Sequence, residues 1–402
     1  MQKVLICASS TSHINNFHLP YLKYFKEQGL EVHVAVPEPA ALEYADYNHD
    51  IPMSKHILSP KNLLAIRKLS GVMKENDFDL ICTHTSLAAL VGRAAVWLVG
   101  KKKAKVINTV HGYLFWNGCG FLRRTLYYLP ERLLRGVTDC VIVMNGEDAV
   151  TARKLVKKGG LVVKVPGMGV DPDRFAPPSG EEKRAARRAL AIPDSAFVLG
   201  YAAEFSKRKN HAELLEALSK IKNAVPDVLL LLCGTGALRD KIESEAKRLE
   251  LSGSIRFMGW CGQMEKIYAA CDLAVSTSRS EGLPFNIMEA QLCAVPVVAS
   301  RIRGHSDLIT NGLNGWLYPP GSPGELAEAV VRIYGSPDRG QKQGTAASAS
   351  AKKYSLAAAF EANTAVYRKM LPTAGPRGPG QAPGTGPDKA VFARSAGMSA
   401  DA

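Results

Sequence analysis

The 402-residue sequence lacks an apolar run long enough to cross a bilayer, because the best candidate, residues 87–100, is short and contains Arg93. It also lacks any Cys-x-x-Cys pair, although it has eight cysteines. Cysteines in apolar stretches are typical of buried thiols in a reducing compartment, not of redox chemistry. The chain turns polar at residues 9–13, which is not typical of a signal peptide. We therefore expect a cytoplasmic protein, with residues 87–100 forming a buried helix.

Metal-binding patterns are absent as well. No group of His and Cys residues has the sequence spacing of a metal site. Two Asp-x-Asp pairs occur, at residues 77–79 and 171–173, but one lies at a helix-to-strand turn and the other in a hinge. We interpret both pairs as structural. The sequence thus predicts a protein that needs no metal and no cofactor.

Positive charge is in excess and unevenly distributed. Residues 1–166 hold 22 Lys and Arg against 13 Asp and Glu, residues 167–335 hold 20 of each, and residues 336–402 hold 9 against 4. The excess suggests an anionic partner for the first half. No nucleic-acid-binding module is recognisable, so an anionic membrane surface is favoured over nucleic acid.

One segment of the first half suits such a surface. Residues 121–135 mix aromatic and aliphatic side chains with four arginines, which are Arg123, Arg124, Arg132 and Arg135, and residues 101–105 add a lysine-rich loop. Amphipathic, arginine-rich segments with aromatic residues bind at lipid headgroups. A partly buried helix with solvated arginines is an equally good interpretation of the same pattern. Both stay open at this point.

Strand-like runs alternate with amphipathic helices through both halves. The expected strands are 4–8, 31–36, 80–83 and 105–110 in the first half, and 197–202, 228–233, 255–258, 273–276 and 296–300 in the second. The expected helices are 19–28, 61–74, 87–99, 212–221, 237–249, 263–270 and 284–293. Alternation of this kind predicts parallel sheets with helices on both faces, and the length predicts two such domains.

The domain boundaries follow from breaks in these patterns. A Pro/Gly-rich stretch at residues 165–175 predicts a first Rossmann-like domain over 1–166 and a second over 167–335. Residues 336–354 read as a polar, Ala/Ser-rich linker, and 355–371 as a helix with an apolar stripe that Asn363 interrupts. Residues 372–402 are rich in Gly, Pro, Ala and Ser, and we expect them to be disordered.

The most informative segment is Ser280-Glu-Gly-Leu-Pro-Phe-Asn-Ile-Met-Glu-Ala290, which follows an expected strand. Pro284 suits the first position of a helix. The backbone N–H groups of Phe285, Asn286 and Ile287 would then lie at the positive end of that helix, just after Leu283, where a diphosphate can bind.

Two carboxylates border this helix start. Glu281 and Glu289 are eight residues apart and could face one cleft, while Gly282 lets a ligand come close. Glu289 could accept hydrogen bonds from ribose hydroxyls, and Glu281 from hydroxyls of a sugar. The alternative is a solvated helix with two ordinary surface glutamates. Apolar neighbours on both sides favour the ligand site, because ligands bind at the carboxyl ends of strands in open α/β sheets.

The pattern Glu281-x7-Glu289 resembles the donor-site signature of family 4 retaining glycosyltransferases, which have the GT-B fold. Four further segments resemble family motifs in order, namely His111-Gly112, Gly167-Met-Gly-Val-Asp171 with Arg174-Phe175, Ala203-Glu204-Phe205 with Lys207-Arg-Lys-Asn210, and Gly234-Thr-Gly236-x-Leu238. The likeness covers residues 1–371. It implies two facing Rossmann-like domains, with a C-terminal helix that crosses back to the first.

The resemblance also implies roles for residues of the second domain. Lys209 would neutralise the donor diphosphate as negative charge builds on it. Many relatives carry an arginine at the position of Glu204, which cannot bind phosphate, so either Arg208 substitutes or the helix dipole carries more of the charge. Gly234 and Gly236 lie where a base or ribose contact is expected.

In the first domain, the resemblance places His111 against the transferred sugar. His13 and Ser12 lie in a first loop where relatives often carry a glycine pair that approaches the phosphates, whereas this chain has Ser10-Thr11-Ser12. We include both as candidate donor contacts.

The opening residues 12–20 and the stretch 111–116 resemble the subgroup that assembles bacterial capsular, exopolysaccharide or other lipid-linked glycans. The implied reaction moves a sugar from a nucleotide diphosphate sugar, by family habit a UDP-sugar, to a glycan or polyprenyl-diphosphate-linked acceptor. No dependable carboxylate for a covalent intermediate is found, which favours front-side displacement with retention. Two alternatives remain: an isomerase like UDP-N-acetylglucosamine 2-epimerase, and a non-catalytic nucleotide-sugar-binding protein.

Overall fold

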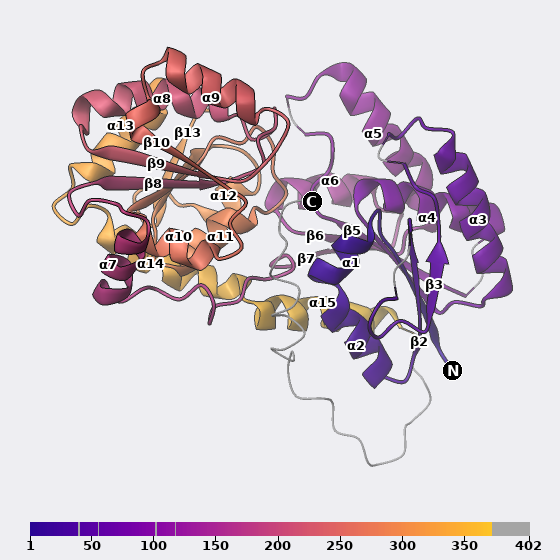
Figure 1. Cartoon of the computed structure of the whole chain (residues 1–402). Coiled ribbons are helices and arrows are strands. Elements are labelled where there is room, and N and C mark those ends of the chain that lie inside the picture. The colour runs from indigo at the N-terminus through magenta and orange to yellow at the C-terminus, as the bar shows by residue number, and fades with distance from the viewer. Residues whose placement is uncertain (39–40, 55, 101–102, 117, 372–402) are drawn as a thin grey trace. The chain divides into compact units, whose positions relative to one another are not determined.

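The computed structural model describes residues 1–38, 41–54, 56–100, 103–116 and 118–371. The chain forms two compact units (Figure 1). The first consists of Met1–Gly169 and the described residues from Leu356, and the second of Val170–Ser355. Each unit contains one parallel sheet. The disorder expected for residues 372–402 concerns a segment outside the described residues.

The first unit has a seven-stranded sheet in the order β3-β2-β1-β4-β5-β6-β7. Its strands are β1 (Lys3–Cys7), β2 (Glu31–Val36), β3 (Tyr47–Asp50), β4 (Leu80–His84), β5 (Lys105–Val110), β6 (Cys140–Val143) and β7 (Leu161–Lys164). The order reverses between β1 and β4, which is where ligands bind in folds of this type. Sequence reasoning missed β3, whose residues are mostly exposed, and the short strands β6 and β7.

The helices of this unit are α1 (Thr11–Phe17), α2 (Leu19–Glu27), α3 (Lys61–Glu75), α4 (Ser86–Val99), α5 (Phe121–Leu133), α6 (Gly146–Leu155) and α15 (Leu356–Met370). We expected Ser12 and His13 in a loop, and this prediction was wrong. Ser10 caps α1 by accepting a hydrogen bond from the His13 N–H, so Ser12 and His13 are helical. The burial expected for α4 holds for Arg93 but not for Trp97 and Leu98, which are exposed.

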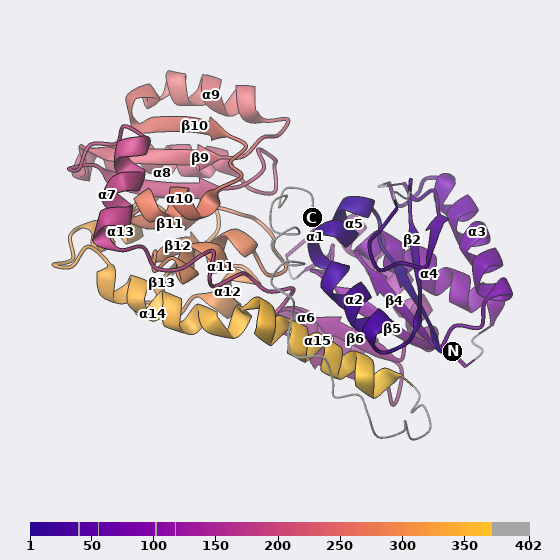
Figure 2. The same cartoon turned by 60° about the horizontal axis from the view of Figure 1, so that its bottom comes forward.

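Helix α15 packs on the first unit, beside α2 (Figure 2). Phe360 stacks on Tyr21 with ring centroids 5.5 Å apart, and Tyr367 lies 5.1 Å from Phe25. Asn363, which interrupts the apolar stripe, is buried and donates hydrogen bonds to the backbone carbonyls of Ala359 and Gly167. The polar residue therefore ties the C-terminal helix to the end of the first domain.

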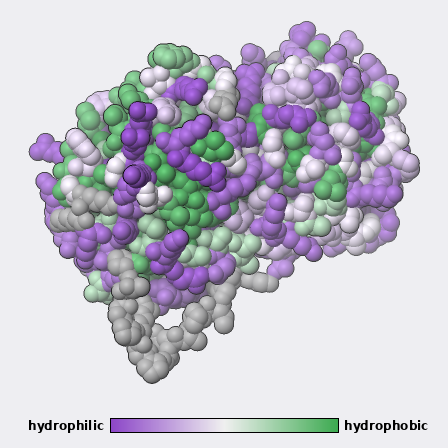
Figure 3. Space-filling model, turned by 180° about the vertical axis from the view of Figure 1, so that it is seen from behind, coloured by the Kyte–Doolittle hydropathy of each residue, from purple (hydrophilic) through white to green (hydrophobic). Residues whose placement is uncertain are grey.

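Helix α5 is the arginine-rich segment, and none of its thirteen described residues is buried. Phe121 and Leu122 are 85% and 81% exposed, and the four arginines of residues 121–135 are exposed as well. An ion pair holds the helix, since the buried Arg93 on α4 binds both carboxylate oxygens of the partly exposed Glu131 at 2.6 and 2.9 Å. Figure 3 shows hydrophobic residues reaching the surface of this unit, on the left, among hydrophilic ones. No helix in the described part of the chain is both long and apolar enough to span a bilayer.

The second unit has a six-stranded sheet in the order β10-β9-β8-β11-β12-β13. Its strands are β8 (Phe197–Ala202), β9 (Val228–Cys233), β10 (Ile255–Gly259), β11 (Leu273–Ser276), β12 (Val297–Ser300) and β13 (Gly315–Tyr318). The helices are α7 (Gly180–Ala189), α8 (His211–Ala224), α9 (Arg239–Arg248), α10 (Met264–Ala270), α11 (Phe285–Leu292), α12 (His305–Leu308), α13 (Pro323–Tyr334) and α14 (Gln341–Ala351). Figure 1 shows α8, α9 and α13 on one face of the sheet and α7, α10, α11 and α14 on the other.

The linker expected at residues 336–354 was wrong. It contains α14, which belongs to the second unit and packs on α11. Small residues allow this close contact: a Cβ on Gly344 would lie 2.0 Å from the Ala294 carbonyl oxygen, and Ser348 donates to the Leu292 carbonyl. The division between the units falls after Gly169, three residues beyond the expected boundary.

Candidate active site

The candidate donor site lies at the carboxyl ends of β8 and β11, the two neighbouring strands at which the strand order of the second unit reverses. Lys209 follows β8 and Glu281 follows β11. Because parallel strands end at the same edge of the sheet, these residues meet although they are 72 positions apart.

Glu281 is held by two cations. Its Oε1 accepts a hydrogen bond from Lys209 Nζ and its Oε2 from Arg208 Nη1, both at 2.7 Å. Burial alone would raise the pKa of the Glu281 carboxyl, but the Lys209 and Arg208 charges outweigh it and lower that pKa to about 2. The carboxylate is therefore ionised across the physiological range. Glu204 is exposed.

The loop that carries Lys209 is fixed by its backbone. The Lys209 carbonyl accepts hydrogen bonds from the Tyr201 hydroxyl at 2.8 Å and from Thr277 Oγ1 at 2.9 Å. Asn210 has a left-handed backbone with φ of 54° and precedes α8. Two buried side chains, one on β8 and one just after β11, thus fix the backbone of the residue that carries the cation.

Helix α11 begins one residue later than expected. Pro284 has φ of −78° and ψ of 124°, so it is the N-cap and Phe285 is the first helical residue. No side chain of the described residues caps this end. The Asn286 side chain donates to the Ala202 carbonyl at 3.0 Å, which ties the helix start to β8. The electropositive helix end is therefore tied to β8, the strand that leads into the Lys209 loop.

Glu289 lies on α11 and is buried, with 8% of its surface exposed. Burial raises the pKa of its carboxyl to about 7. The two glutamates of the signature thus differ in charge state: Glu281 is ionised, whereas Glu289 titrates near neutral pH. Neither is an ordinary surface glutamate.

The two glycines of the Gly-x-Gly turn have a packing role that only the structure shows. Gly234 and Gly236 have φ of 145° and 146°. A Cβ on Gly234 would lie 2.1 Å from the Ala203 carbonyl oxygen, and one on Gly236 2.6 Å from the Phe205 nitrogen. Only glycine allows this turn to lie against the loop after β8.

Sequence reasoning missed Arg303 and His305, which follow β12 and are buried. Arg303 donates from Nε to the Glu281 carbonyl oxygen at 3.1 Å. His305 Nδ1 lies 2.8 Å from the Ser300 carbonyl oxygen, and burial lowers the pKa of this histidine to about 4. A cluster of polar residues just after a buried strand was the available signal. Gly304, between them, lies so close that its Cβ would be 2.5 Å from the Gly282 carbonyl oxygen.

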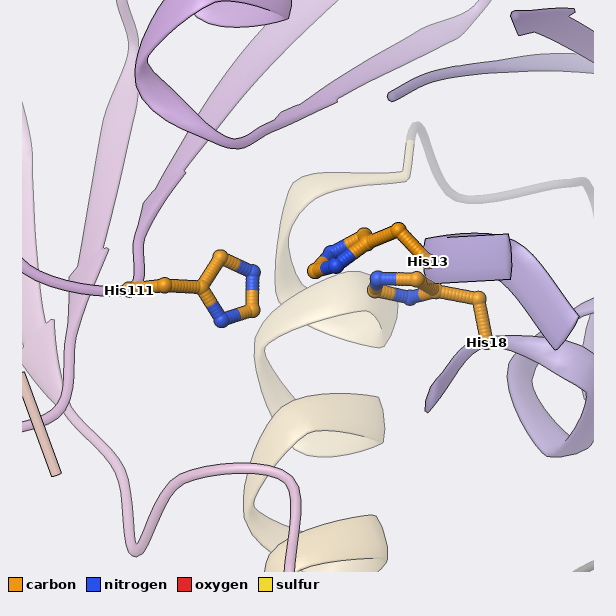
Figure 4. A group of neighbouring side chains, drawn as sticks. All are labelled: His13, His18 and His111. Carbon is orange, nitrogen blue, oxygen red and sulfur yellow. The ribbon is translucent and has the colours of Figure 1, made fainter. Parts of the chain in front are cut away.

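In the first unit, the structure brings His111 and His13 together with two further histidines that sequence reasoning did not select. His111 directly follows β5, His84 ends β4, and His13 and His18 lie in and after α1. Ring centroids are 4.9 Å apart for His13 and His111 and 4.0 Å apart for His18 and His84. Figure 4 shows the rings of His13, His18 and His111 directed toward one another. The position of His84 at the end of a strand was a signal that could have found it, whereas His18 lies between α1 and α2 and had no such signal.

These histidines are neutral. Burial lowers the pKa of His13 to about 4 and that of His84 to about 3, and it lowers the pKa of His18 and His111 well below the ordinary value. One ring nitrogen of each has no hydrogen-bond partner among the described residues, and these are Nε2 of His13, His18 and His111 and Nδ1 of His84. Ser12 lies next to His13 on α1, and its hydroxyl is 3.1 Å from that of Ser10.

Two family descriptions match the chain. Residues 21–174 match "Glycosyltransferase Family 4" and residues 182–350 match "Glycosyl transferases group 1". The chain is 32% identical over 370 residues to a putative glycosyltransferase EpsD of Bacillus subtilis, covering 92% of this chain and 97% of the relative. It is 27% identical over 286 residues to a UDP-Gal:alpha-D-GlcNAc-diphosphoundecaprenol alpha-1,3-galactosyltransferase of Escherichia coli, covering 70% and 73%.

Solved structures agree on the fold. The crystal structure of Anabaena Alr3699/HepE in complex with UDP-glucose has a TM-score of 0.73 at 20% identity, covering 92% of this chain and 99% of the other. Sucrose-phosphate synthase from Thermosynechococcus elongatus gives a TM-score of 0.75 at 20% identity with the same coverage. With the EpsD relative matched over nearly its whole length, the chain belongs to the family 4 glycosyltransferases and has the GT-B fold.

Proposed function

We propose that this glycosyltransferase moves a sugar from a UDP-sugar to a polyprenyl-diphosphate-linked glycan, with retention of anomeric configuration and without a metal, in the assembly of a bacterial surface polysaccharide. The observation that carries the proposal is the ion pair of Glu281 with Lys209 beside the start of α11. A cation, an electropositive helix end and a fixed carboxylate at one sheet edge suit a nucleotide diphosphate sugar.

The donor contacts divide among these groups. Lys209 and the N–H groups at the start of α11, next to Leu283, Pro284, Phe285 and Asn286, bind the diphosphate, and Arg208 adds a second cation. Glu289 accepts hydrogen bonds from the ribose, and the turn at Gly234 and Gly236 lies beside the base. Glu281 holds hydroxyls of the transferred sugar, with Gly282 allowing close approach.

Catalysis then rests on charge stabilisation of the leaving phosphate and on positioning. As the bond to the sugar breaks, Lys209 and the helix end stabilise the negative charge on UDP. The departing phosphate accepts the proton of the attacking acceptor hydroxyl on the same face of the sugar, which gives retention. From the first unit we assign His111 to the transferred sugar, with His13 and Ser12 as further contacts.

The names of relatives support the choice of donor and acceptor. The Escherichia coli relative is named for UDP-Gal and for a diphosphoundecaprenol acceptor, and HepE has been crystallised with UDP-glucose. We extend to this chain the shared chemistry, a UDP-sugar donor and a lipid-diphosphate acceptor.

Independence from metal is supported by the roles of the Asp-x-Asp pairs. Asp79 Oδ2 accepts a hydrogen bond from the Lys3 N–H at 2.8 Å, and Asp171 Oδ1 accepts one from the Asp173 N–H at 2.9 Å. These carboxylates stabilise a strand start and a turn. Lys209 and the helix end supply the positive charge that a divalent ion supplies elsewhere.

A lipid-linked acceptor requires access to a membrane, and we assign this to α5 in the first unit. Its exposed Phe121 and Leu122 can insert at the headgroups while its arginines bind anionic lipid. We expect the protein to sediment with vesicles containing phosphatidylglycerol, and the combined Phe121→Ser and Leu122→Ser variant to remain in solution. Equal sedimentation of both proteins would remove α5 from the proposal.

The function is tested with purified protein, EDTA, a panel of UDP-, GDP- and ADP-sugars, and a polyprenyl-diphosphate-linked sugar. We expect one UDP-sugar to be consumed only when the acceptor is present, and NMR of the product to show the donor's anomeric configuration. An epimerised donor formed without acceptor would instead identify an isomerase. Donor binding without turnover under all conditions would identify a non-catalytic binding protein.

A further inference from the structure

We propose that His13, His18 and His111 together bind one transition-metal ion of the Zn²⁺ class. We propose further that this ion inhibits the enzyme; this second part rests on the proposed role of His111 in sugar transfer. The site lies in the first unit alone, at the carboxyl ends of β1 and β5.

The geometry of the three imidazoles supports the site. One ring nitrogen from each histidine can be chosen such that all three lie within 4.8 Å of one another. Figure 4 shows the rings converging on one space from two sides, with His111 opposite the other two. Tetrahedral zinc with bonds of about 2.0–2.1 Å places neighbouring nitrogens roughly 3.3 Å apart. Side-chain shifts of about 1 Å would therefore close the site.

A second observation is independent of spacing. The Nε2 atoms of all three rings are buried and have no hydrogen-bond partner among the described residues. Buried polar atoms without partners are costly, and native proteins satisfy nearly all of them. Three such atoms in one group, each a neutral imidazole nitrogen with a free lone pair or N–H, indicate a missing common partner. A metal ion bound to the three rings would supply such a partner.

The donor set selects the class of metal. Imidazole nitrogens suit Zn²⁺, Cu²⁺ and Ni²⁺, whereas Mg²⁺ and Ca²⁺ prefer oxygen ligands, and the cluster contains no carboxylate. His84 is a candidate for the fourth ligand, because its ring centroid is 4.0 Å from that of His18 and its Nδ1 also lacks a partner in the described structure. Otherwise water completes the coordination.

Another pair of histidines shows the contrast. His33 Nδ1 lies 2.9 Å from His49 Nε2, and His33 Nε2 lies 2.7 Å from Glu31. Both nitrogens of His33 are therefore already satisfied by protein atoms. This pair serves as the internal control for metal binding.

Inhibition follows from the position of His111. An ion bound to its ring removes the nitrogen that the proposed function assigns to the sugar, and it adds positive charge to a cluster that is otherwise neutral. Since the proposed reaction uses no metal, the ion has no compensating role.

The test uses the full-length protein without a histidine tag, stripped with EDTA and then dialysed. We expect one equivalent of Co²⁺ to give the visible absorption of a tetrahedral site, and Zn²⁺ to displace it. His18→Gln and, separately, His13→Gln should weaken Zn²⁺ binding at least tenfold, while His49→Gln should bind as the wild type does. Absence of a stoichiometric site, or binding by both cluster variants as tight as that of the wild type, overturns the site.

Inhibition is measured separately, as the transfer rate with Zn²⁺ relative to the rate of the same protein in EDTA. We expect Zn²⁺ at a few times its dissociation constant to reduce the wild-type rate at least fivefold. The His18→Gln variant should need an at least tenfold higher Zn²⁺ concentration for the same inhibition. Binding without inhibition, or activation by Zn²⁺, overturns the inhibitory role. Because binding is read by absorbance, it remains testable if the proposed transfer reaction is wrong.

Discussion

The two units carry polar clusters in equivalent places, yet the clusters are built on opposite principles. In each, the cluster lies at the carboxyl ends of central parallel strands, where the strand order reverses. In the second unit, Glu281, Lys209 and Arg208 satisfy one another by ion pairs. In the first, His13, His18, His84 and His111 are neutral and leave ring nitrogens without partners in the described structure. The fold thus fixes the location of a site, and its residues determine which kind of ligand the site can bind.

This difference indicates that the two clusters suit different kinds of ligand. A preformed array of charges needs little rearrangement to receive an anionic diphosphate. A neutral cluster can instead receive hydroxyl groups or a metal ion. The following predictions test whether the two clusters act independently in this way.

The largest effect is expected from Lys209→Met. The substitution keeps most of the length of the side chain but removes the cation to which we assign stabilisation of the leaving phosphate, so kcat/KM for the donor should fall by about 10²–10³-fold. Steady-state kinetics with a saturating acceptor measure this. Lys207→Met, at an exposed position two residues away, is the control and should change kcat/KM less than threefold. A similar loss in both variants would show that loop charge in general, not Lys209, matters.

His111→Ala should separate the two clusters. We expect kcat to fall by roughly 10²-fold through lost positioning of the sugar, while the dissociation constant of UDP stays unchanged. Steady-state kinetics measure kcat, and calorimetric titration measures the dissociation constant of UDP. The control is His56→Ala, at an exposed position of the same unit. A matching loss of UDP affinity would contradict the division between the clusters.

Gly234→Ala tests how rigidly the donor site is built. The new Cβ would meet the Ala203 carbonyl oxygen at 2.1 Å with φ at 145°, so we expect a loss of about 1–3 kcal/mol in the free energy of unfolding. Urea unfolding followed by circular dichroism measures it. Gly253→Ala introduces a Cβ with no heavy atom within 4 Å and should cost less than about 0.5 kcal/mol. Equal stability of the two variants would mean that the turn can shift.

The smallest effect concerns pH and distinguishes the two glutamates. Because the pKa of Glu289 is raised to about 7, its carboxylate fraction grows between pH 6 and 8. Ribose hydroxyls need the carboxylate as acceptor, so the dissociation constant of UDP should fall by up to about tenfold over this range, and Glu289→Gln should abolish the change. Glu281, with a pKa of about 2, does not titrate there. A profile unaltered in Glu289→Gln would assign the titration to another group.

As the pH changes, the two carboxyl groups affect the free energy of unfolding in opposite directions. The folded-state pKa of Glu289 lies above its ordinary 4.5, so its contribution is fully present below pH 4.5 and is lost as the pH rises through 7. The pKa of Glu281 lies below 4.5, so its contribution is present above that pH and is lost as the pH falls through 2.

The repeating strands and helices could be predicted because periodicity is local. Strands β8 and β9 were predicted with the bounds that the structure has, since buried parallel strands read as continuous apolar runs. Helix α14 could not, because its Ala/Ser composition has no apolar stripe. It is helical against α11 because small residues permit close packing, and that partner lies elsewhere in the sequence.

The candidate site shows the same limit. The spacing of Glu281 and Glu289 and the position of Lys209 were readable as a motif, but the ion pair between Lys209 and Glu281 joins the ends of two strands. Likewise, the sequence contains no histidine pattern with metal spacing, because His18 follows α1 whereas His111 follows β5, far away in the sequence.

By itself, the sequence determined that the chain has two α/β domains, which segment is the candidate anion site, and which family it resembles, because apolar period, helix-start chemistry and short motifs are local properties. Only the tertiary structure decided which groups are charged and which histidines meet. Both depend on burial and on neighbours that the parallel topology brings to one sheet edge: burial with cations lowers one glutamate's pKa, burial without them raises the other's, and the same edge in the first unit gathers four neutral imidazoles.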